Sequence, residues 1–134
     1  MDATFNDIGA VILFVEDVRR SRAFYHDVLG LEVQFEDVDS IGFKIEGLAF
    51  IVLQVARAHE QLHGQPTATP GPGATAFLTT FTDDVDGLHT EMARRGVDFF
   101  QVPTDQHWGM RTAYFKDPDG HVWELAQSID GSDS

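Results

Sequence analysis

One carboxylate stands out on an otherwise apolar segment near the end of the chain. Glu124 lies within "HVWELAQ" (121–127), directly after the turn sequence "DPDG" (117–120). A carboxylate on such a strand can be a metal ligand, a general base whose pKa is raised by apolar neighbours, or a counter-charge for a cationic ligand. It can also be solvated at an edge or paired with a neighbour such as Arg111. The residues by themselves leave these alternatives open.

A second chemical pattern is "HEQLH" (59–63), which satisfies the H-E-x-x-H arrangement of zinc-binding helices. That chemistry requires both histidines on one continuous helix and a third ligand further along the chain. The preceding "FIVLQV" is strand-like, and Gly64 and Pro66 permit at most a turn or two of helix. We therefore expect a solvated helical turn here and no zinc protease site.

Composition excludes several classes of protein. A chain of 134 residues with 43% hydrophobic content fits one globular domain. The formal charge of −13 repels phosphate backbones and anionic lipids, so neither nucleic acid nor a membrane is expected as a partner. The absence of cysteine excludes disulfides and thiolate nucleophiles. The N-terminal segment has no basic stretch and its apolar run is too short to span a bilayer, which favours a cytoplasmic protein.

Two similar halves must position these residues. In the first half, the apolar pattern predicts a strand at 8–15, a helix at 18–29 between Asp17 and Gly30, and strands at 31–36, 41–46 and 48–55. In the second half it predicts a strand at 75–82, a helix that begins at 85 and closes at Gly96, and strands at 97–103, 111–117 and 121–127. Both halves therefore read β-α-β-β-β.

The two halves form an internal repeat. Asp17 aligns with Asp84, and Gly30 aligns with Gly96. The intervening "QPTATPGPGA" (65–74) contains three of the five prolines and can continue neither helix nor strand. We predict one domain with a first module at about 6–56, a linker at about 57–74, a second module at about 75–127 and a tail at 128–134. Since one module cannot bury its sheet face alone, the two sheets are expected to close around a shared cavity.

These segments resemble a known family. "VEDVRRSRAFYHDVLGLEV" (15–33) resembles the opening helix of the glyoxalase/bleomycin resistance/dioxygenase superfamily, and "GMRTAYFKDPDGHVWELAQ" (109–127) resembles its closing hairpin. The resemblance covers residues 8 to about 127 and implies the vicinal oxygen chelate (VOC) fold, an α+β fold in which two βαβββ modules form a cup-shaped cavity. The superfamily includes lyases, epimerases, ring-cleaving dioxygenases, thiol transferases and drug-sequestering proteins without catalysis, so the fold leaves the function open.

The resemblance also identifies the positions of metal ligands. In the metal-dependent members, four equivalent strand positions point into the cup, and three or four of them carry His, Glu or Gln. Here these positions are Ala10, Ile51, Phe77 and Glu124. A transition metal needs at least three protein donors, and only Glu124 can donate, so we expect no metal and no other cofactor. A metal at Glu124 would need donors from elsewhere, such as His107, His121 or a second chain.

The predicted cup has an apolar and aromatic lining. Strand alternation puts Ala10, Ile12 and Phe14 on the cup side of the first strand, while Val11, Leu13 and Val15 face the helix. Trp108 lies in a loop beside a glycine, where it either stacks on a ligand or packs on its own sheet. The candidate ligand-binding residues are Glu124, Trp108, Phe77, Arg111, Ile12, Phe14, Thr79 and Phe81.

These observations favour a binding protein over an enzyme. The predicted function is metal-independent sequestration of a small aromatic or cationic molecule, of the antibiotic-resistance type, with Glu124 as the counter-charge. The alternative is a VOC-family enzyme of the lyase, isomerase or dioxygenase type that acts on a small carbonyl or thiol compound; no catalytic residue is assigned. A homodimer is expected because open strand edges favour pairing.

Overall fold

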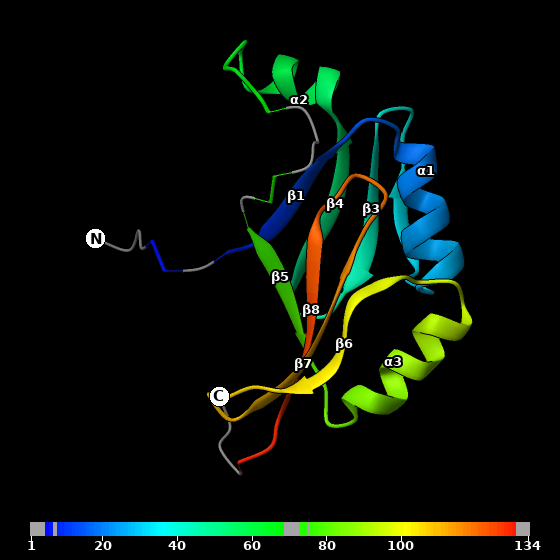
Figure 1. Ribbon diagram of the computed structural model, residues 1–134. Helices are drawn as coiled ribbons and strands as arrows, with labels where there is room; N and C mark the ends of the chain where they lie inside the picture. The colour runs from blue at the N-terminus through cyan, green and yellow to red at the C-terminus, as the bar shows by residue number, and fades with distance from the viewer. Residues whose placement is uncertain (1–4, 7, 69–72, 75, 131–134) are drawn as a thin grey trace. The chain divides into compact units, whose positions relative to one another are not determined.

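The computed structural model describes residues 5–6, 8–68, 73–74 and 76–130 (Figure 1). The chain divides into two compact units, Met1–Thr69 and Pro70–Ser134. Each unit contains a four-stranded mixed sheet, and the predicted β-α-β-β-β order occurs in both. The α+β class with two βαβββ modules is therefore confirmed.

The first unit contains β1 (Ala10–Val15), α1 (Val18–Arg22), the π-helix η1 (Ala23–Val28), β2 (Val33–Glu36), β3 (Ser40–Ile45), β4 (Leu48–Gln54) and α2 (Val55–Gln61). The strand order is β1-β4-β3-β2. β1 pairs in parallel with β4, and the other two pairs are antiparallel. The sequence predicted every one of these strands, but it placed α2 in the linker.

The helix after β1 begins and ends where its residue types require. The Asp17 carboxylate accepts a hydrogen bond from the backbone N–H of Arg19 at 2.9 Å, which satisfies one of the free donors of the first turn. At the other end Gly30 has a φ of 83°, a conformation that glycine adopts without strain. Between them the helix widens, because the N–H of Leu29 donates to the carbonyl of Phe24, five residues earlier. The apolar spacing predicted one continuous helix and did not reveal this change.

The core of the first unit lies between its sheet and this helix. Tyr25 from η1 contacts Phe43 and Phe50, with ring centroids 5.5 and 5.0 Å away. Val15 and Val18 are fully buried beside them. Alternation along β1 therefore turns its odd-numbered residues toward the helix, as predicted.

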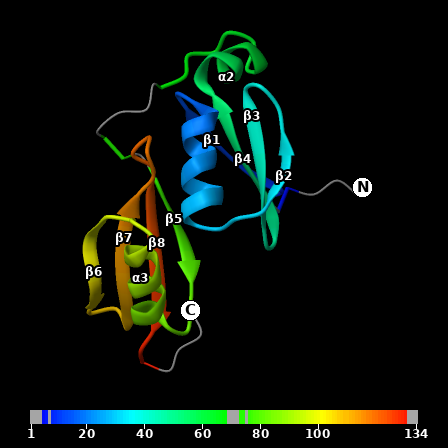
Figure 2. The same ribbon diagram turned by 90° about the vertical axis from the view of Figure 1, so that its right-hand side faces the viewer.

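The second unit contains β5 (Phe77–Phe81), α3 (Val85–Arg94), β6 (Phe99–Asp105), β7 (Met110–Lys116) and β8 (Val122–Ser128). Its strand order, β5-β8-β7-β6, repeats that of the first unit. α3 covers one face of this sheet (Figure 2). On that face Phe99 contacts His89 of α3 and Phe115 of β7, at centroid distances of 4.5 and 5.3 Å. We call the other face of this sheet the open face.

The repeat predicted from the sequence holds at the helix ends. The Asp84 carboxylate accepts from the N–H of Gly87 at 3.0 Å, as Asp17 does for its own helix. Gly96, like Gly30, follows its helix with a positive φ. Within the ranges that the structure describes, no helix has the length and apolar character needed to cross a membrane.

Candidate ligand-binding site

Strand register arranges the residues of the open face in rows that cross β5, β8 and β7. The Phe77 row consists of Phe77, Val122 and Lys116; the Glu124 row of Thr79, Glu124 and Tyr114; and the Phe81 row of Phe81, Ala126 and Thr112. In-register residues of neighbouring strands lie about 5 Å apart, so their side chains are in direct contact range. The Glu124 row is therefore a polar band between two mainly apolar rows.

Glu124 accepts hydrogen bonds from both neighbours in its row. The Thr79 hydroxyl donates to Oε1 at 2.8 Å, and the Tyr114 hydroxyl donates to Oε2 at 2.5 Å. The Glu124 residue is only 9% exposed, and a carboxylate at that depth is costly unless donors satisfy its oxygens. Burial, followed by the hydrogen bond to Glu124, raises the pKa of Tyr114, so its phenol is a proton donor at neutral pH. The hypothesis that Glu124 is solvated at an edge is therefore wrong.

Arg111 does not pair with Glu124. Its guanidinium binds both carboxylate oxygens of Asp86 on α3, at 2.9 and 3.0 Å, and Asp105 on β6 at 2.9 Å. These hydrogen bonds raise the pKa of Arg111 above its ordinary value. Arg111 lies opposite Gln127 in the ladder, so alternation turns it away from the open face. Its prediction as a residue of the Glu124 site is corrected: Arg111 links α3 to the sheet edge.

Aromatic rings surround the Tyr114 side chain. Its ring meets Phe77 edge-on at 6.1 Å and is stacked with Phe100 at 5.8 Å. Phe77, Phe81 and Phe100 are exposed by 56%, 68% and 59%. Exposed rings gathered around a polar band are typical of a ligand surface, whereas scattered exposed apolar residues are ordinary.

Phe100 was not among the predicted site residues. The pairing of β6 with β7 is irregular between Phe99 and Gln101, which lie opposite Phe115 and Tyr114. Phe99 points to the α3 side, while Phe100 and Gln101 both contact open-face residues, Tyr114 and Thr112. A bulge of this kind adds a residue to one face, and strict alternation along "VDFFQVP" does not reveal it.

Trp108 lies at the far end of the second unit from Phe77. It belongs to the turn between β6 and β7, is 53% exposed, and meets His107 edge-on at 4.9 Å. The strand β7 leads from this turn to Lys116 in the Phe77 row, a path of about 20 Å at the usual rise per residue. A small ligand cannot span that distance, so the expectation that Trp108 and Phe77 flank one ligand within this unit is wrong.

Ile12 and Phe14 lie on the corresponding face of the first-unit sheet. They are in register with Ile51 and Leu53 of β4. The predicted alternation of β1 is thus confirmed. A role for Ile12 and Phe14 beside a ligand of the second unit stays a prediction.

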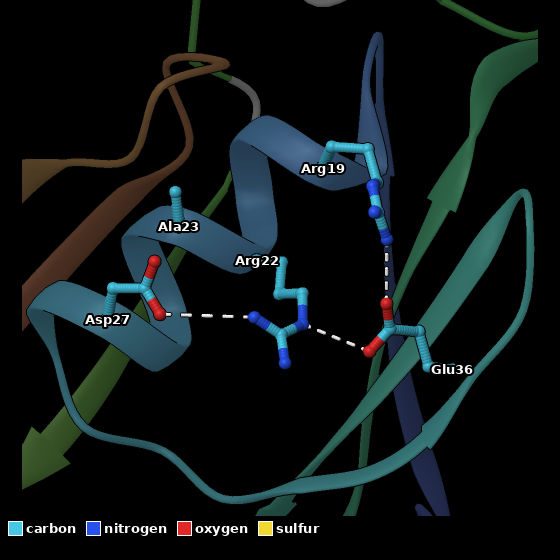
Figure 3. Close-up of a pocket in the computed structure, with 5 residues that line it drawn as sticks. All are labelled: Arg19, Arg22, Ala23, Asp27 and Glu36. Atoms are coloured by element: carbon cyan, nitrogen blue, oxygen red, sulfur yellow. Dashed lines mark hydrogen bonds and ion pairs between the residues drawn. The ribbon is translucent and has the colours of Figure 1, made fainter.

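The first unit also has a shallow pocket of about 420 Å³, lined by Arg19, Arg22, Ala23, Asp27 and Glu36 (Figure 3). Glu36 accepts from Arg19 at 2.7 Å and from Arg22 at 3.0 Å, and Arg22 lies 3.9 Å from Asp27. The hydrogen bond from Arg22 is the main cause that lowers the pKa of Glu36. Because these charges neutralise one another, a charged ligand would have to displace an existing ion pair. We therefore interpret this pocket as a surface ion-pair network and take the open face around Glu124 as the candidate binding site.

The donor set does not fit a metal ion. Of the four positions that carry metal ligands in the resemblance, Ala10, Ile51 and Phe77 have no donor atom, and both oxygens of Glu124 accept hydroxyl protons. No group of three His, Cys, Asp or Glu side chains suited to a metal occurs in the part of the chain that the structure describes. The "HEQLH" pattern also fails, since α2 ends at Gln61 and His63 lies beyond it with a φ of 57°.

Two βαβββ units with an acidic residue on the last strand define a protein of the VOC fold class. Residues 7–125 match the sequence model of the Glyoxalase/Bleomycin resistance protein/Dioxygenase superfamily, and the chain belongs to this superfamily.

Similar proteins come from several bacteria. YraH of Bacillus subtilis is 30% identical over 126 residues, which cover 87% of this chain and 94% of YraH. Virulence protein STM3117 of Salmonella typhimurium is 25% identical over 130 residues, covering 91% and 84% of the two chains. The crystal structure of a glyoxalase/bleomycin resistance protein/dioxygenase from Nocardioides has a TM-score of 0.85 at 22% identity, covering 97% of this chain and 88% of that one. This last similarity confirms the fold.

Proposed function

We propose that this protein binds a small aromatic molecule with a cationic group on the open face, without a metal and without covalent chemistry. This is sequestration of the antibiotic-resistance type. The observation that carries the proposal is the position of Glu124: a carboxylate held by two hydroxyl donors among exposed aromatic rings. A fixed carboxylate beside aromatic faces attracts a cation through both its charge and the ring quadrupoles.

The net charge of the chain and the exposed aromatic rings of the open face support the same class of ligand. The formal charge of −13 raises the local concentration of cations near the surface. Phe77 and Phe81 on β5 and Phe100 on β6 present ring surface on both sides of the polar band. A planar molecule can therefore cover exposed apolar area while its polar group reaches Glu124.

One observation favours a metal-free enzyme as the second candidate. The raised pKa of Tyr114 keeps the phenol protonated, and its contact with Glu124 provides a proton acceptor beside it. In that case Glu124 would accept a proton from a thiol or from the carbon beside a carbonyl group, while the hydroxyl of Tyr114 holds its carboxylate in place. Turnover of such a compound, abolished in Glu124→Gln, would favour this candidate.

The test of the binding proposal changes the charge of Glu124 and little else. In a calorimetric screen of planar cationic antibiotics and their neutral analogues, Glu124→Gln should weaken the cationic molecules by about 1 to 3 kcal/mol, the range of a charge-assisted hydrogen bond. The neutral analogues should be little affected. Phe100→Ala should weaken both kinds, because stacking does not need a full charge.

Trp108→Ala is the control variant, since Trp108 is an exposed aromatic residue of the same unit that lies far from Glu124. Its ligand affinities should equal those of the wild type. If Glu124→Gln binds every cationic ligand as tightly as the wild type does, the counter-charge role is wrong.

A further inference from the structure

The open face carries a second formal charge. In β5, β7 and β8, all of whose residues the structure describes, the open-face positions include two charged side chains, Glu124 and Lys116. The Lys116 ammonium lies 5.7 Å from the ring centroid of Phe100, a cation–π contact. No carboxylate among the described residues lies within ion-pair distance of Lys116. An anionic group of a ligand can therefore pair with this ammonium without displacing a carboxylate.

The two charges lie on either side of an aromatic ring. Glu124 is in register with Tyr114, and Lys116 is two residues further along β7. Such diagonal positions are about 7 to 8 Å apart in an antiparallel pair. Lys116 reaches toward Phe100, which stacks on Tyr114, so its ammonium lies further still from the carboxylate. The separation matches the length of one benzene ring with a charged group at each end.

A ligand with only a positive charge fits this surface poorly. It would gain the attraction of Glu124 but would share the rings of Tyr114 and Phe100 with the Lys116 ammonium, a like charge. A ligand with an anionic group at its other end gains from both charges. We propose that the site selects a zwitterionic aromatic ligand, with its cationic group at Glu124, its anionic group at Lys116, and its ring on Tyr114 and Phe100. This inference rests on the proposed function and names its ligand class.

Four matched probes test it: 4-(aminomethyl)benzoate, its methyl ester, 4-(hydroxymethyl)benzoate and the methyl ester of that acid. They share one ring and carry both charges, the cation only, the anion only, and no charge. Binding is followed by the amide shifts of β7 and β8 in nitrogen-15 NMR titrations. The zwitterion should bind about threefold tighter than the probe with the cation only, as expected for a partly exposed ion pair at Lys116. It should bind at least about fivefold tighter than the probe with the anion only, as expected for a charge-assisted hydrogen bond at Glu124.

The variants assign each charge to its residue. Lys116→Met should abolish the preference for the free carboxylate over its ester and keep the preference for the ammonium over the hydroxyl. Glu124→Gln should do the reverse. Lys44→Met is the matched control, because Lys44 lies opposite Ala49 in the first unit as Lys116 lies opposite Val122 in the second. It changes the net charge equally and should leave all four affinities unaltered.

The possible outcomes separate the two proposals. Equal affinities of all four probes at the open face would overturn the zwitterion inference and leave an aromatic binding site. Tightest binding of the aminomethyl ester, strengthened further in Lys116→Met, would also overturn it, since Lys116 would then only repel the ligand. If no probe shifts the amides of β7 and β8, both the inference and the proposed function are wrong.

Discussion

Removing the Tyr114 hydroxyl tests the hydrogen-bonded Glu124 row directly. In Tyr114→Phe, the ring contacts with Phe77 and Phe100 remain, while Glu124 retains Thr79 as its hydroxyl donor. Hydrogen bonds to charged groups contribute about 1.5 to 3 kcal/mol to stability. Because the hydrogen bond between Tyr114 and Glu124 is only partly buried, water can replace part of it. We therefore expect the free energy of unfolding to fall by about 1.5 to 2 kcal/mol, the lower part of this range.

Tryptophan fluorescence in urea is the appropriate assay. Both tryptophans, Trp108 and Trp123, belong to the second unit, so the signal reports the unit that holds Glu124. With a slope of about 1.5 to 2 kcal/mol per molar urea, the midpoint should fall by roughly 1 M. The control is the same change in a Glu124→Met background, where the partner is already absent. There the cost should drop below about 0.5 kcal/mol. Equal costs in the two backgrounds would refute the reasoning.

The difference between wild type and Tyr114→Phe should also depend on pH. The pKa of Tyr114 is raised above its ordinary value of 10.0, mainly by burial and then by the hydrogen bond to Glu124. A raised folded-state pKa means that the contribution is fully present below the unfolded value and is lost as the pH rises through the folded value. The difference in unfolding free energy should therefore be constant near neutrality and shrink above pH 10. A difference that stays constant across that range contradicts the assigned contact.

Two further predictions concern metal and assembly. Protein purified without chelator should hold no stoichiometric transition metal, because Ala10, Ile51 and Phe77 offer no donors. Addition of a chelator should leave its melting temperature unchanged. One equivalent of iron, nickel or zinc whose removal lowers the melting temperature would contradict this. Light scattering at micromolar concentration should give about twice the chain mass of 14.9 kDa, since open strand edges favour pairing. A measured mass equal to that of a single chain would exclude the homodimer.

Much of the Glu124 row could be predicted from the sequence. The apolar run after the "DPDG" turn located the strand at 121–127, and the structure has it at Val122–Ser128. Alternation put Phe77, Thr79 and Phe81 on one face, as the pairing confirms. Tyr114 was missed. Counting outward in equal steps from the "DPDG" turn pairs Glu124 with Ala113, whereas the structure pairs it with Tyr114, because Asp117 already bonds to His121 across the turn.

The remaining errors have local physical causes. Arg111 was assigned to the site because it lies near Glu124 in the hairpin, but three steps along β7 separate it from Tyr114, and an odd number of steps reverses the face. Phe100 reaches the open face through an irregularity of β6. Such a bulge depends on packing against the neighbouring strand, so the β6 sequence alone does not specify it.

The row equivalent to the Glu124 row is apolar in the first unit and polar in the second. In the first unit the positions in register are Ile12, Ile51 and Gly42, which correspond to Thr79, Glu124 and Tyr114. The ring of Phe35 lies over Gly42 so closely that a Cβ there would stand 2.1 Å from its Cε2 atom. This apolar row needs no hydrogen-bond partner, whereas a carboxylate in the same place needs donors or a cation.

The hydroxyls of Thr79 and Tyr114 meet that need for Glu124 without a metal ion. The two sheets have the same strand order, and the rows differ only in the side chains at their in-register positions. The same sheet topology can therefore carry an apolar row in one unit and a polar row in the other. The charged residues of the proposed ligand site therefore belong to the second unit. Exchanging the Glu124 row for the residues of the first-unit row should keep the fold and remove discrimination between charged and neutral ligands.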